Sequence, residues 1–581
     1  MLRRVAHRLL LALSRPFVDL GRGERAVFFG VAILHVVAIT WGLPSSDAWD
    51  VDGIAPRDFL PGVIETFTPG KYFTYPPLHL GLLSLITLPF SAAAIARSPS
   101  LAQADVVATF IGVPTMTALS LAARIVNCLM SLGIVLVLGK LGATIFGPRA
   151  RIWVIAFAGV EVAGTYYAHT SNLDIPALFW SSLALLVLAR AVKGDEPKRL
   201  RQVALLAACA ISSKDQAYAM FAVTMPSVIV AWALVARMRS GSARAIVREA
   251  LLCAVITIGV VLVVDGALFN PSGFAARLRF LTGHASQDYA MYSRDTAGRI
   301  SVVRDAILFL DRHYPVAIAP LVVLGMVGAF VRSKGNDRVA AAIPLLAIVS
   351  FTLAFNCVAR RIEERFMMPQ MQLYAVYAGG AVAMLLDAAG PRVVIAWVVR
   401  LGAAACVLAG VRLTACMLAT MIGDPRYIAE RYLSENVRPG DLVEVYGNNV
   451  YLPRFPPAAR VERVGTNPPA ARSPMPNIVE RQDRLSAVAE RNPRFVVVSM
   501  GYAWRFLHRP PSEQEKGHVL PAAQAAILAD EDSTSYVRRL FAGEAGYKIA
   551  YHCFYPGHGA LLPPRHLHAS LASDVYVFER R

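Results

Sequence analysis

Three carboxylates lie close together just after the first apolar stretch of this chain, in the segment WGLPSSDAWDVDGIAPRD: Asp47, Asp50 and Asp52. Charge beside a membrane-spanning helix costs free energy, so such a cluster needs an explanation. A carboxylate held in a partly dry cavity can act as a general base, because it can take the proton of an attacking hydroxyl group. A solvated loop that caps the neighbouring helices would explain the same residues without any chemistry.

Two further segments place polar side chains next to apolar runs. YYAHTSNLDIPALFW contains His169 and Asp174, and SSKDQAYAMF contains Lys214 and Asp215. Asp174 also suits a helix start two residues before Pro176, and His169 also suits an apolar interior. Adjacent residues on a helix do not face each other, so Lys214 needs an anion other than Asp215. A lipid phosphate would meet that need, and so would a salt bridge to Asp174 or to the first loop.

Arginines cluster in ARRIEERFMMPQMQ, which holds Arg360, Arg361 and Arg365 together with Glu363 and Glu364. Guanidinium groups bind phosphate through paired hydrogen bonds, so an anionic substrate would account for the cluster. A local network of ion pairs with the two glutamates is the alternative.

Aromatic side chains precede a pair of prolines in KYFTYPPLHLGLL. Tyr72, Phe73 and Tyr75 suit the membrane interface, and Pro76 and Pro77 suit the start of the next helix. The segment is therefore explained by the interface alone, although it also places Tyr75 among the residues that can meet a substrate.

The composition indicates which elements must position these residues. The chain is 56% hydrophobic and only 17% charged, which is typical of a polytopic membrane protein and excludes an ordinary soluble one. Its formal charge is +18, and its Lys and Arg residues collect in short loops, as is typical of oriented membrane proteins. We therefore expect no nucleic-acid partner. The seven cysteines form neither a disulfide framework nor a metal-binding pattern.

Hydropathy predicts about eleven transmembrane helices. One of them, 202–213, is short. The apolar stretch 78–96 is expected to be an interfacial or re-entrant helix, because a full crossing there would put the basic loop GPRARI outside. The expected spans are 26–43, 118–142, 152–169, 175–192, 202–213, 217–236, 250–269, 314–331, 339–358, 366–386 and 393–417.

Basic loops orient the chain in the cell (inner) membrane. We expect residues 1–25 to be cytoplasmic, with an interfacial helix followed by an uncleaved signal anchor. The five polar segments then meet on the outer face. The transmembrane domain is predicted to span residues 1–423, and the composition change near 424 predicts an extracytoplasmic α/β domain over 424–581. In that domain DLVEVYG, RFVVVSM, YKIAYHCF and DVYVFER are expected as strands, and 426–436, 479–491 and 521–541 as helices.

The order of these motifs resembles family 39 of the polytopic, C-type membrane glycosyltransferases, which are related to protein mannosyltransferases and to the aminoarabinose transferase of lipid A. The matching features are an acidic first outer loop after WGLP, then YPPL, NLDIPALFW, SSKDQAY and RFMMP. The resemblance covers roughly residues 20–390, and the C-terminal domain matches only in position.

The resemblance implies a transferase that moves one sugar from a polyprenyl-phosphate donor to an acceptor hydroxyl of a lipid, glycan or protein on the outer side, with inversion. Asp50 falls at the family's catalytic aspartate. Because this chain has Asp-Val-Asp where the family often has Asp-Glu, the choice between Asp50 and Asp52 stays open. Lys214, Arg365 and Arg361 would bind the donor phosphate. Residues expected to contact the substrates are Tyr75, His169, Asp174 and Asp215.

No metal is expected to be required, since side-chain cations can hold a single phosphate. An Asp-x-Asp pair could still bind magnesium or manganese. A transporter or flippase of a lipid-linked or anionic solute is the main alternative, and it should show paired broken helices in two corresponding halves. A membrane anchor for the C-terminal domain is a third reading, which leaves the charged residues unexplained.

Overall fold

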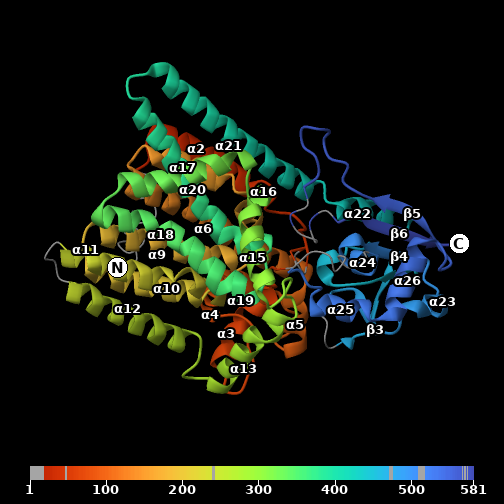
Figure 1. The fold of residues 1–581 in the computed structure, drawn as a ribbon. Coiled ribbons are helices and arrows are strands. Elements are labelled where there is room, and N and C mark those ends of the chain that lie inside the picture. Colours follow the sequence, from red (N-terminus) through yellow and green to blue (C-terminus); the bar gives the residue numbers. More distant parts are fainter. Residues whose placement is uncertain are drawn as a thin grey trace.

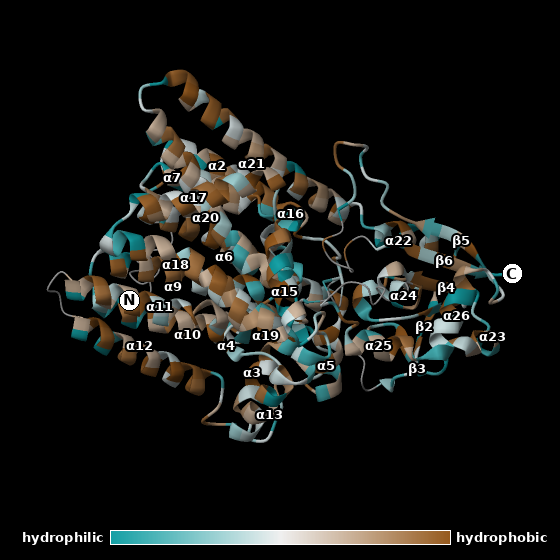
Figure 2. Ribbon diagram, in the orientation of Figure 1, coloured by the Kyte–Doolittle hydropathy of each residue, from teal (hydrophilic) through white to brown (hydrophobic). Residues whose placement is uncertain are grey.

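The computed structural model describes residues 19–45, 49–50, 52–238, 243–469, 475–507, 517–565, 567, 571 and 573–581. The expected N-terminal interfacial helix and Asp47 lie outside these residues. Figure 1 shows two parts, a large helical bundle and a C-terminal α/β domain at one end of it. In Figure 2 the helices of the bundle are predominantly hydrophobic along their lengths.

Among the described residues, eight helices are long and apolar enough to cross a membrane, or nine if one bent pair counts as a single span. This confirms a polytopic helical fold with an added α/β domain. The eight are α4 (Pro77–Arg97), α6 (Val113–Phe146), α9 (Asp174–Lys193), η3 with α11 (Asp215–Met238), α12 (Ala243–Val264), α18 through α19 (Gly335–Ala359), α20 (Glu364–Ala389) and α21 with α22 (Val393–Asn436).

The difference from eleven expected spans has a physical cause. Helix α2 (Arg22–Val36) has 15 residues and α10 (Leu200–Ile211) has 12. The expected span 152–169 is broken into α7 (Ala150–Gly159) and α8 (Val162–Ala168), because the Glu161 side chain caps α8 by accepting from the backbone N–H groups of Ala163 and Gly164. These shorter helices still pack in the bundle, α10 against α9 and α12, and α7 against α6 and α20. Conversely, α4 is long enough to cross, although 78–96 was expected to be interfacial.

Shorter helices gather at the end of the bundle that faces the α/β domain (Figure 1). Helix α15 (Thr296–Leu308) and α16 (Leu310–His313) are followed by a bend of 112° into α17 (Ala319–Arg332). Helix α15 therefore runs crosswise to the apolar helix that follows it. The other short elements are α3 (Phe59–Phe67), α5 (Gln103–Ile111), α13 (Pro271–Thr282) and α14 (His284–Gln287).

The α/β domain contains one six-stranded sheet in the order β3-β2-β1-β4-β6-β5. Strands β3, β2, β1 and β4 are parallel, whereas β6 runs antiparallel to β4 and β5. The strands are β1 (Leu442–Val445), β2 (Arg460–Gly465), β3 (Ile478–Gln482), β4 (Phe495–Ser499), β5 (Tyr547–Cys553) and β6 (Val575–Arg580). The helices are α22 (Pro425–Asn436), α23 (Val488–Arg491), α24 (Met500–Leu507), α25 (Ala522–Leu528) and α26 (Glu531–Phe541).

All four expected strands of this domain are present, and the helix expected at 426–436 is α22. Two expectations were wrong. The region 479–491, expected to be a helix, begins as β3, and β2 was not among the expected strands. Strand β2 buries Glu462 and Arg463, which it can do because Arg463 pairs with Glu480 on the neighbouring strand. Hydropathy does not predict a strand whose buried side chains are charged.

Candidate functional site

The first loop is held against the loop that precedes α9. The Ser171 hydroxyl donates to the carbonyl oxygen of Ile54 at 2.8 Å, and the Asn172 amide donates to the carbonyl oxygen of Asp52 at 3.3 Å. Asn127 of α6 supports that second loop by donating to the carbonyls of Thr170 at 2.8 Å and Asn172 at 2.7 Å. The acidic loop is therefore anchored to the bundle, and it is not a solvated cap.

Asp52 forms an ion pair with Arg365, which lies in the first turn of α20. The hydroxyl of Tyr167 approaches the other carboxylate oxygen of Asp52 at 3.5 Å. Arg365 also lies 3.3 Å, Nε to Oε2, from Glu363. Two segments more than 300 residues apart thus meet through opposite charges, as convergence on the outer face predicts.

Lys214 follows α10 and Asp174 opens α9, and the two side chains pair at 2.5 Å. They are only 14% and 9% exposed. Of the two alternatives that the sequence left open for Lys214, the salt bridge to Asp174 is therefore present. It uses one of the three N–H donors of the ammonium group.

Three cations surround one aromatic ring at this end of the bundle. Lys214 lies 5.9 Å from the centre of the Phe366 ring, Arg361 4.9 Å and Arg365 4.5 Å. Arg361 is 9% exposed and pairs with Glu363. We call Lys214, Arg361, Arg365 and their partners Asp52, Asp174 and Glu363 the charge cluster.

Tyr75 lies within reach of the charge cluster. Burial first, and then the carboxylate of Asp52, raise the pKa of the Tyr75 phenol, while Arg365 lowers it. Its ring is 39% exposed. Tyr75 thus borders the cluster from the loop before α4.

Asp50 is buried more deeply than Asp52, with 3% of its surface exposed. One carboxylate oxygen accepts from the backbone N–H of Asp52 at 3.3 Å and from the hydroxyl of Tyr166 at 3.4 Å. Arg124 of α6 acts on Asp50 electrostatically, while its guanidinium donates to the carbonyl of Trp41 at 2.6 Å. Sequence reasoning missed Arg124, although a single arginine within an apolar run is a signal of its own.

Asp215 does not join the charge cluster. It pairs with Arg277 of α13, which is 1% exposed and lies 5.0 Å from the centre of the Phe73 ring. His169 is fully buried, and one ring nitrogen lies 2.6 Å from the carbonyl oxygen of Thr165. Neither residue therefore contacts the three cations directly, and Arg277 was not anticipated from the sequence.

An apolar cavity of about 350 Å³ adjoins the charge cluster. Arg361, Phe366 and Asp215 line one part of it. The rest is mainly hydrophobic, with walls that include Ile211, Val261, Phe274, Leu278, Leu281 and Phe355. The arrangement can hold an apolar chain with an anionic end at Arg361.

The α/β domain holds the segment that leads to Asp50. The Trp41 indole donates to the carboxylate of Asp424 at 3.0 Å, and the backbone N–H of Gly42 donates to the hydroxyl of Tyr427 at 2.8 Å. Gly42 has φ of +72°, and a Cβ there would lie 2.9 Å from the Trp49 ring. A side chain at this position would therefore both strain the backbone and displace Trp49.

Two arginines of the same domain complete this contact. Arg426 lies 4.0 Å from the centre of the Trp49 ring, and its guanidinium pairs with Asp424. Arg454 donates to the carbonyl of Pro44 at 3.2 Å and pairs with Glu430. We call these contacts, together with those of Trp41 and Tyr427, the loop clamp. The loop clamp holds Trp49, the residue before Asp50, and the segment that leads to it against the α/β domain.

The described residues contain no group of three or more His, Cys, Asp or Glu side chains placed to hold a metal ion. Asp52, which an Asp-x-Asp metal site would need, is engaged by Arg365. Asp47, the third carboxylate of the acidic loop, lies outside the described residues, and the function proposed below assigns no step to a metal ion.

Neither a protein-family model nor a curated protein matches the chain. Among solved structures it is similar to the archaeal oligosaccharyltransferase AglB from Archaeoglobus fulgidus in complex with an inhibitory peptide and a dolichol-phosphate, with 12% identity, 96% of this chain and 88% of that chain covered, and a TM-score of 0.44.

It is also similar to ArnT from Cupriavidus metallidurans. For the apo state the identity is 16%, the coverage 82% of this chain and 93% of that one, and the TM-score 0.43. For ArnT bound to undecaprenyl phosphate the identity is 16%, the coverage 86% of this chain and 98% of that one, and the TM-score 0.41. The function proposed below rests on the residues of the site and on the sequence motifs.

Proposed function

We propose that this protein transfers one sugar from a polyprenyl-phosphate donor to an acceptor hydroxyl on the extracytoplasmic side of the cell (inner) membrane, with inversion. The observation that carries the proposal is the convergence of Lys214, Arg361 and Arg365 on the Phe366 ring, beside Asp52 and next to an apolar cavity. Cations gathered at the end of an apolar cavity suit a lipid phosphate.

The donor phosphate binds where the cations retain hydrogen-bond donors. Lys214 donates one N–H to Asp174, and Arg365 donates to Asp52 while its Nε lies 3.3 Å from Glu363. The other N–H groups of both side chains can donate to phosphate oxygens. The polyprenyl chain then lies in the 350 Å³ cavity, with Arg361 at its polar end.

Asp50 acts as the general base, and Asp52 is the second choice. The ion pair with Arg365 favours the charged form of Asp52, which weakens it as a proton acceptor. The acceptor oxygen attacks the anomeric carbon as its proton passes to Asp50, and the bond from that carbon to the phosphate oxygen breaks. A single displacement of this kind inverts the configuration, and polyprenyl phosphate leaves.

Tyr75, Asp174, Asp215 and His169 support the substrates at different distances from the reacting atoms. Tyr75 borders the charge cluster, and Asp174 orients Lys214. Asp215 lines the donor cavity, whereas His169 supports the interior behind the first loop. The N-terminus is cytoplasmic and the α/β domain extracytoplasmic in this proposal, since the domain contacts the loop that carries Asp50.

The test is release of polyprenyl phosphate from a labelled polyprenyl-phosphate sugar by the purified, membrane-reconstituted protein. Asp50→Asn keeps the size of the side chain but removes its basicity, so turnover should fall by about a hundredfold or more while donor binding survives. Asp337→Asn, at an exposed position, is the matched control and should behave as the unaltered protein.

Near-normal turnover of Asp50→Asn would move the base to Asp52, and the same result for Asp52→Asn would remove the loop from the chemistry. Asp47→Asn should cost little. Donor movement across the membrane without bond cleavage would instead favour the transporter alternative.

A further inference from the structure

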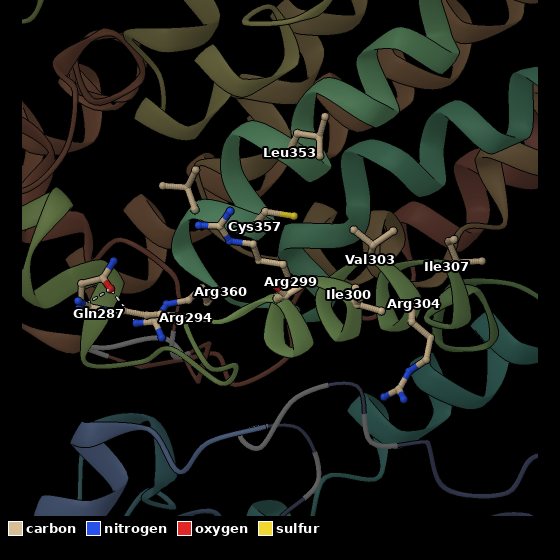
Figure 3. A pocket seen from close by; sticks show the side chains of 12 residues that line it. Gln287, Arg294, Arg299, Ile300, Val303, Arg304, Ile307, Leu353, Cys357 and Arg360 are labelled. Carbon is tan, nitrogen blue, oxygen red and sulfur yellow. Dashed lines mark hydrogen bonds between the residues drawn. The ribbon is translucent and has the colours of Figure 1, made fainter. Parts of the chain in front are cut away.

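Arg360 and Arg361 are neighbours in sequence but line different cavities. Arg361 lines the 350 Å³ cavity at the charge cluster, whereas Arg360 lines a second cavity of about 1,090 Å³. Arg360 ends the short helix α19 (Cys357–Ala359) in the left-handed conformation, with φ of +54°. Figure 3 shows this second cavity between α15 and the end of α19.

The second cavity is strongly basic. Its lining includes Arg294, Arg299, Arg304 and Arg360 and contains no aspartate or glutamate. Arg304 pairs with Asp305 at 2.7 Å, and Arg360 donates to the carbonyl of Tyr292 at 2.7 Å.

The remaining two arginines have little to bind. Among the described residues, Arg294 has a single long contact of 3.5 Å, with Gln287. Within the described part of the chain, the Arg299 side chain makes no hydrogen bond or ion pair with protein. The cavity therefore offers positive charge that nearby carboxylates do not neutralise.

One wall of the same cavity is apolar and faces away from the protein core. Ile300, Val303 and Ile307 of α15 are 63%, 38% and 62% exposed, and they point into the cavity in Figure 3. Leu353 and Val358 also line the cavity, at 47% and 60% exposed. The outward face of α15 therefore presents apolar side chains and arginines together.

The position of α15 suits the membrane surface. The 112° bend before α17 sets α15 crosswise to an apolar helix. A helix that runs across the spanning direction and exposes apolar and basic side chains together suits the headgroup layer, where its apolar side chains can reach the acyl chains. Lipid phosphates occupy that depth.

We propose that this cavity binds the phosphate of an anionic membrane lipid, with the lipid chains lying along Ile300, Val303 and Ile307. The four arginines favour a headgroup with net negative charge over a zwitterionic one, and the apolar wall favours a lipid over free phosphate. This inference does not depend on the proposed function, because no residue of the charge cluster lines this cavity, although it shares Gln287 and Val358 with the 350 Å³ cavity, and because its test measures binding.

The test measures binding of short-chain phosphatidylglycerol, short-chain phosphatidylcholine and inorganic phosphate to the full-length protein in detergent. Phosphatidylglycerol should bind saturably and at least about tenfold more tightly than the other two. The double variant Arg294→Gln/Arg299→Gln should lose about tenfold or more of that affinity. Both side chains are exposed and make no ion pair, so folding should survive, which size-exclusion chromatography checks.

Two control variants locate the effect. Arg392→Gln removes an exposed arginine between α20 and α21, and Lys214→Met/Asp174→Asn removes a cation of the charge cluster together with its partner carboxylate; both should keep phosphatidylglycerol affinity. Equal binding of phosphatidylcholine would contradict the preference for a negatively charged headgroup, and equal binding of free phosphate would contradict a role for the lipid chains. An unchanged affinity in Arg294→Gln/Arg299→Gln, or a loss in Lys214→Met/Asp174→Asn alone, would contradict the proposed location.

Discussion

Replacing Lys214 separates a structural role from a role in donor binding. Lys214 and Asp174 pair at 2.5 Å with side chains that are 14% and 9% exposed. The second carboxylate oxygen of Asp174 has no hydrogen-bond partner among the described residues. Lys214→Met therefore leaves a buried charge uncompensated, which should cost about 3–5 kcal/mol of stability. It also removes a charge-assisted contact to the phosphate, worth roughly 1.5–3 kcal/mol, or about ten- to a hundredfold in donor affinity.

The double variant Lys214→Met/Asp174→Asn distinguishes the two effects. With the carboxylate neutralised, most of the lost stability should return, whereas the donor affinity should stay low. Thermal unfolding measures the first quantity, and competition by polyprenyl phosphate against a labelled donor measures the second. Arg149→Met is the matched control, because it breaks an exposed pair with Asp387 and should cost less than about 1 kcal/mol. If the double variant regains normal donor affinity, Lys214 serves only to neutralise Asp174, and the phosphate site is elsewhere.

Three further predictions follow from the contacts of the α/β domain and from the orientation. Trp41→Phe removes the indole N–H that hydrogen-bonds to Asp424 and should lower turnover by about tenfold, because a small displacement of the Asp50 loop misplaces the base. The affinity for the sugar donor should change little. Trp397→Phe, which alters an exposed tryptophan of α21, should change neither turnover nor affinity. Glu444→Gln removes one of the two carboxylates that pair with the buried side chain of Arg491, leaving Asp483, and should destabilise the α/β domain by about 1.5–3 kcal/mol in thermal unfolding. A smaller loss than for Asp441→Asn at the part-exposed Arg494 pair would contradict this. An impermeant thiol reagent should label Lys334→Cys only from the cytoplasmic side and Glu435→Cys only from outside. Cys553 should give little background labelling, since burial raises the pKa of that thiol to about 12. Labelling of Lys334→Cys from outside would reverse the proposed topology.

Much of the charge cluster could be predicted because charge in apolar surroundings is conspicuous. Asp52, Asp174, Lys214 and Arg365 each stand beside a long apolar run, and each needs a partner from another segment. The sequence could not pair them, since the pairing depends on how α9, α10 and α20 pack. Lys214 was expected to need an anion other than its neighbour Asp215, and in the structure the two residues pair with Asp174 and Arg277.

Two signals in the sequence were available but not used. Glu161 interrupts the apolar run 152–169, and in the structure it breaks that run into α7 and α8 and pairs with the buried His313. Arg124 lies within the apolar run of α6 and donates to the carbonyl of Trp41. Both follow the rule that a charge within an apolar run has a specific partner. Strand β2 had no such signal, because its buried Glu462 and Arg463 look like surface residues until the neighbouring strand is known.

The balance of the charge cluster bears on how the proposed reaction is accelerated. Lys214, Arg361 and Arg365 are matched by Asp52, Asp174 and Glu363, so the cluster carries no net charge before the donor binds. A polyprenyl-phosphate sugar is a phosphodiester with one negative charge, and the departing polyprenyl phosphate gains a second as the sugar leaves. A neutral cluster binds the diester with moderate affinity. Its N–H groups that make no hydrogen bond to protein form stronger hydrogen bonds to the phosphate as the new negative charge develops. The cations therefore stabilise the transition state more than the bound donor, which is the condition for raising turnover as well as affinity.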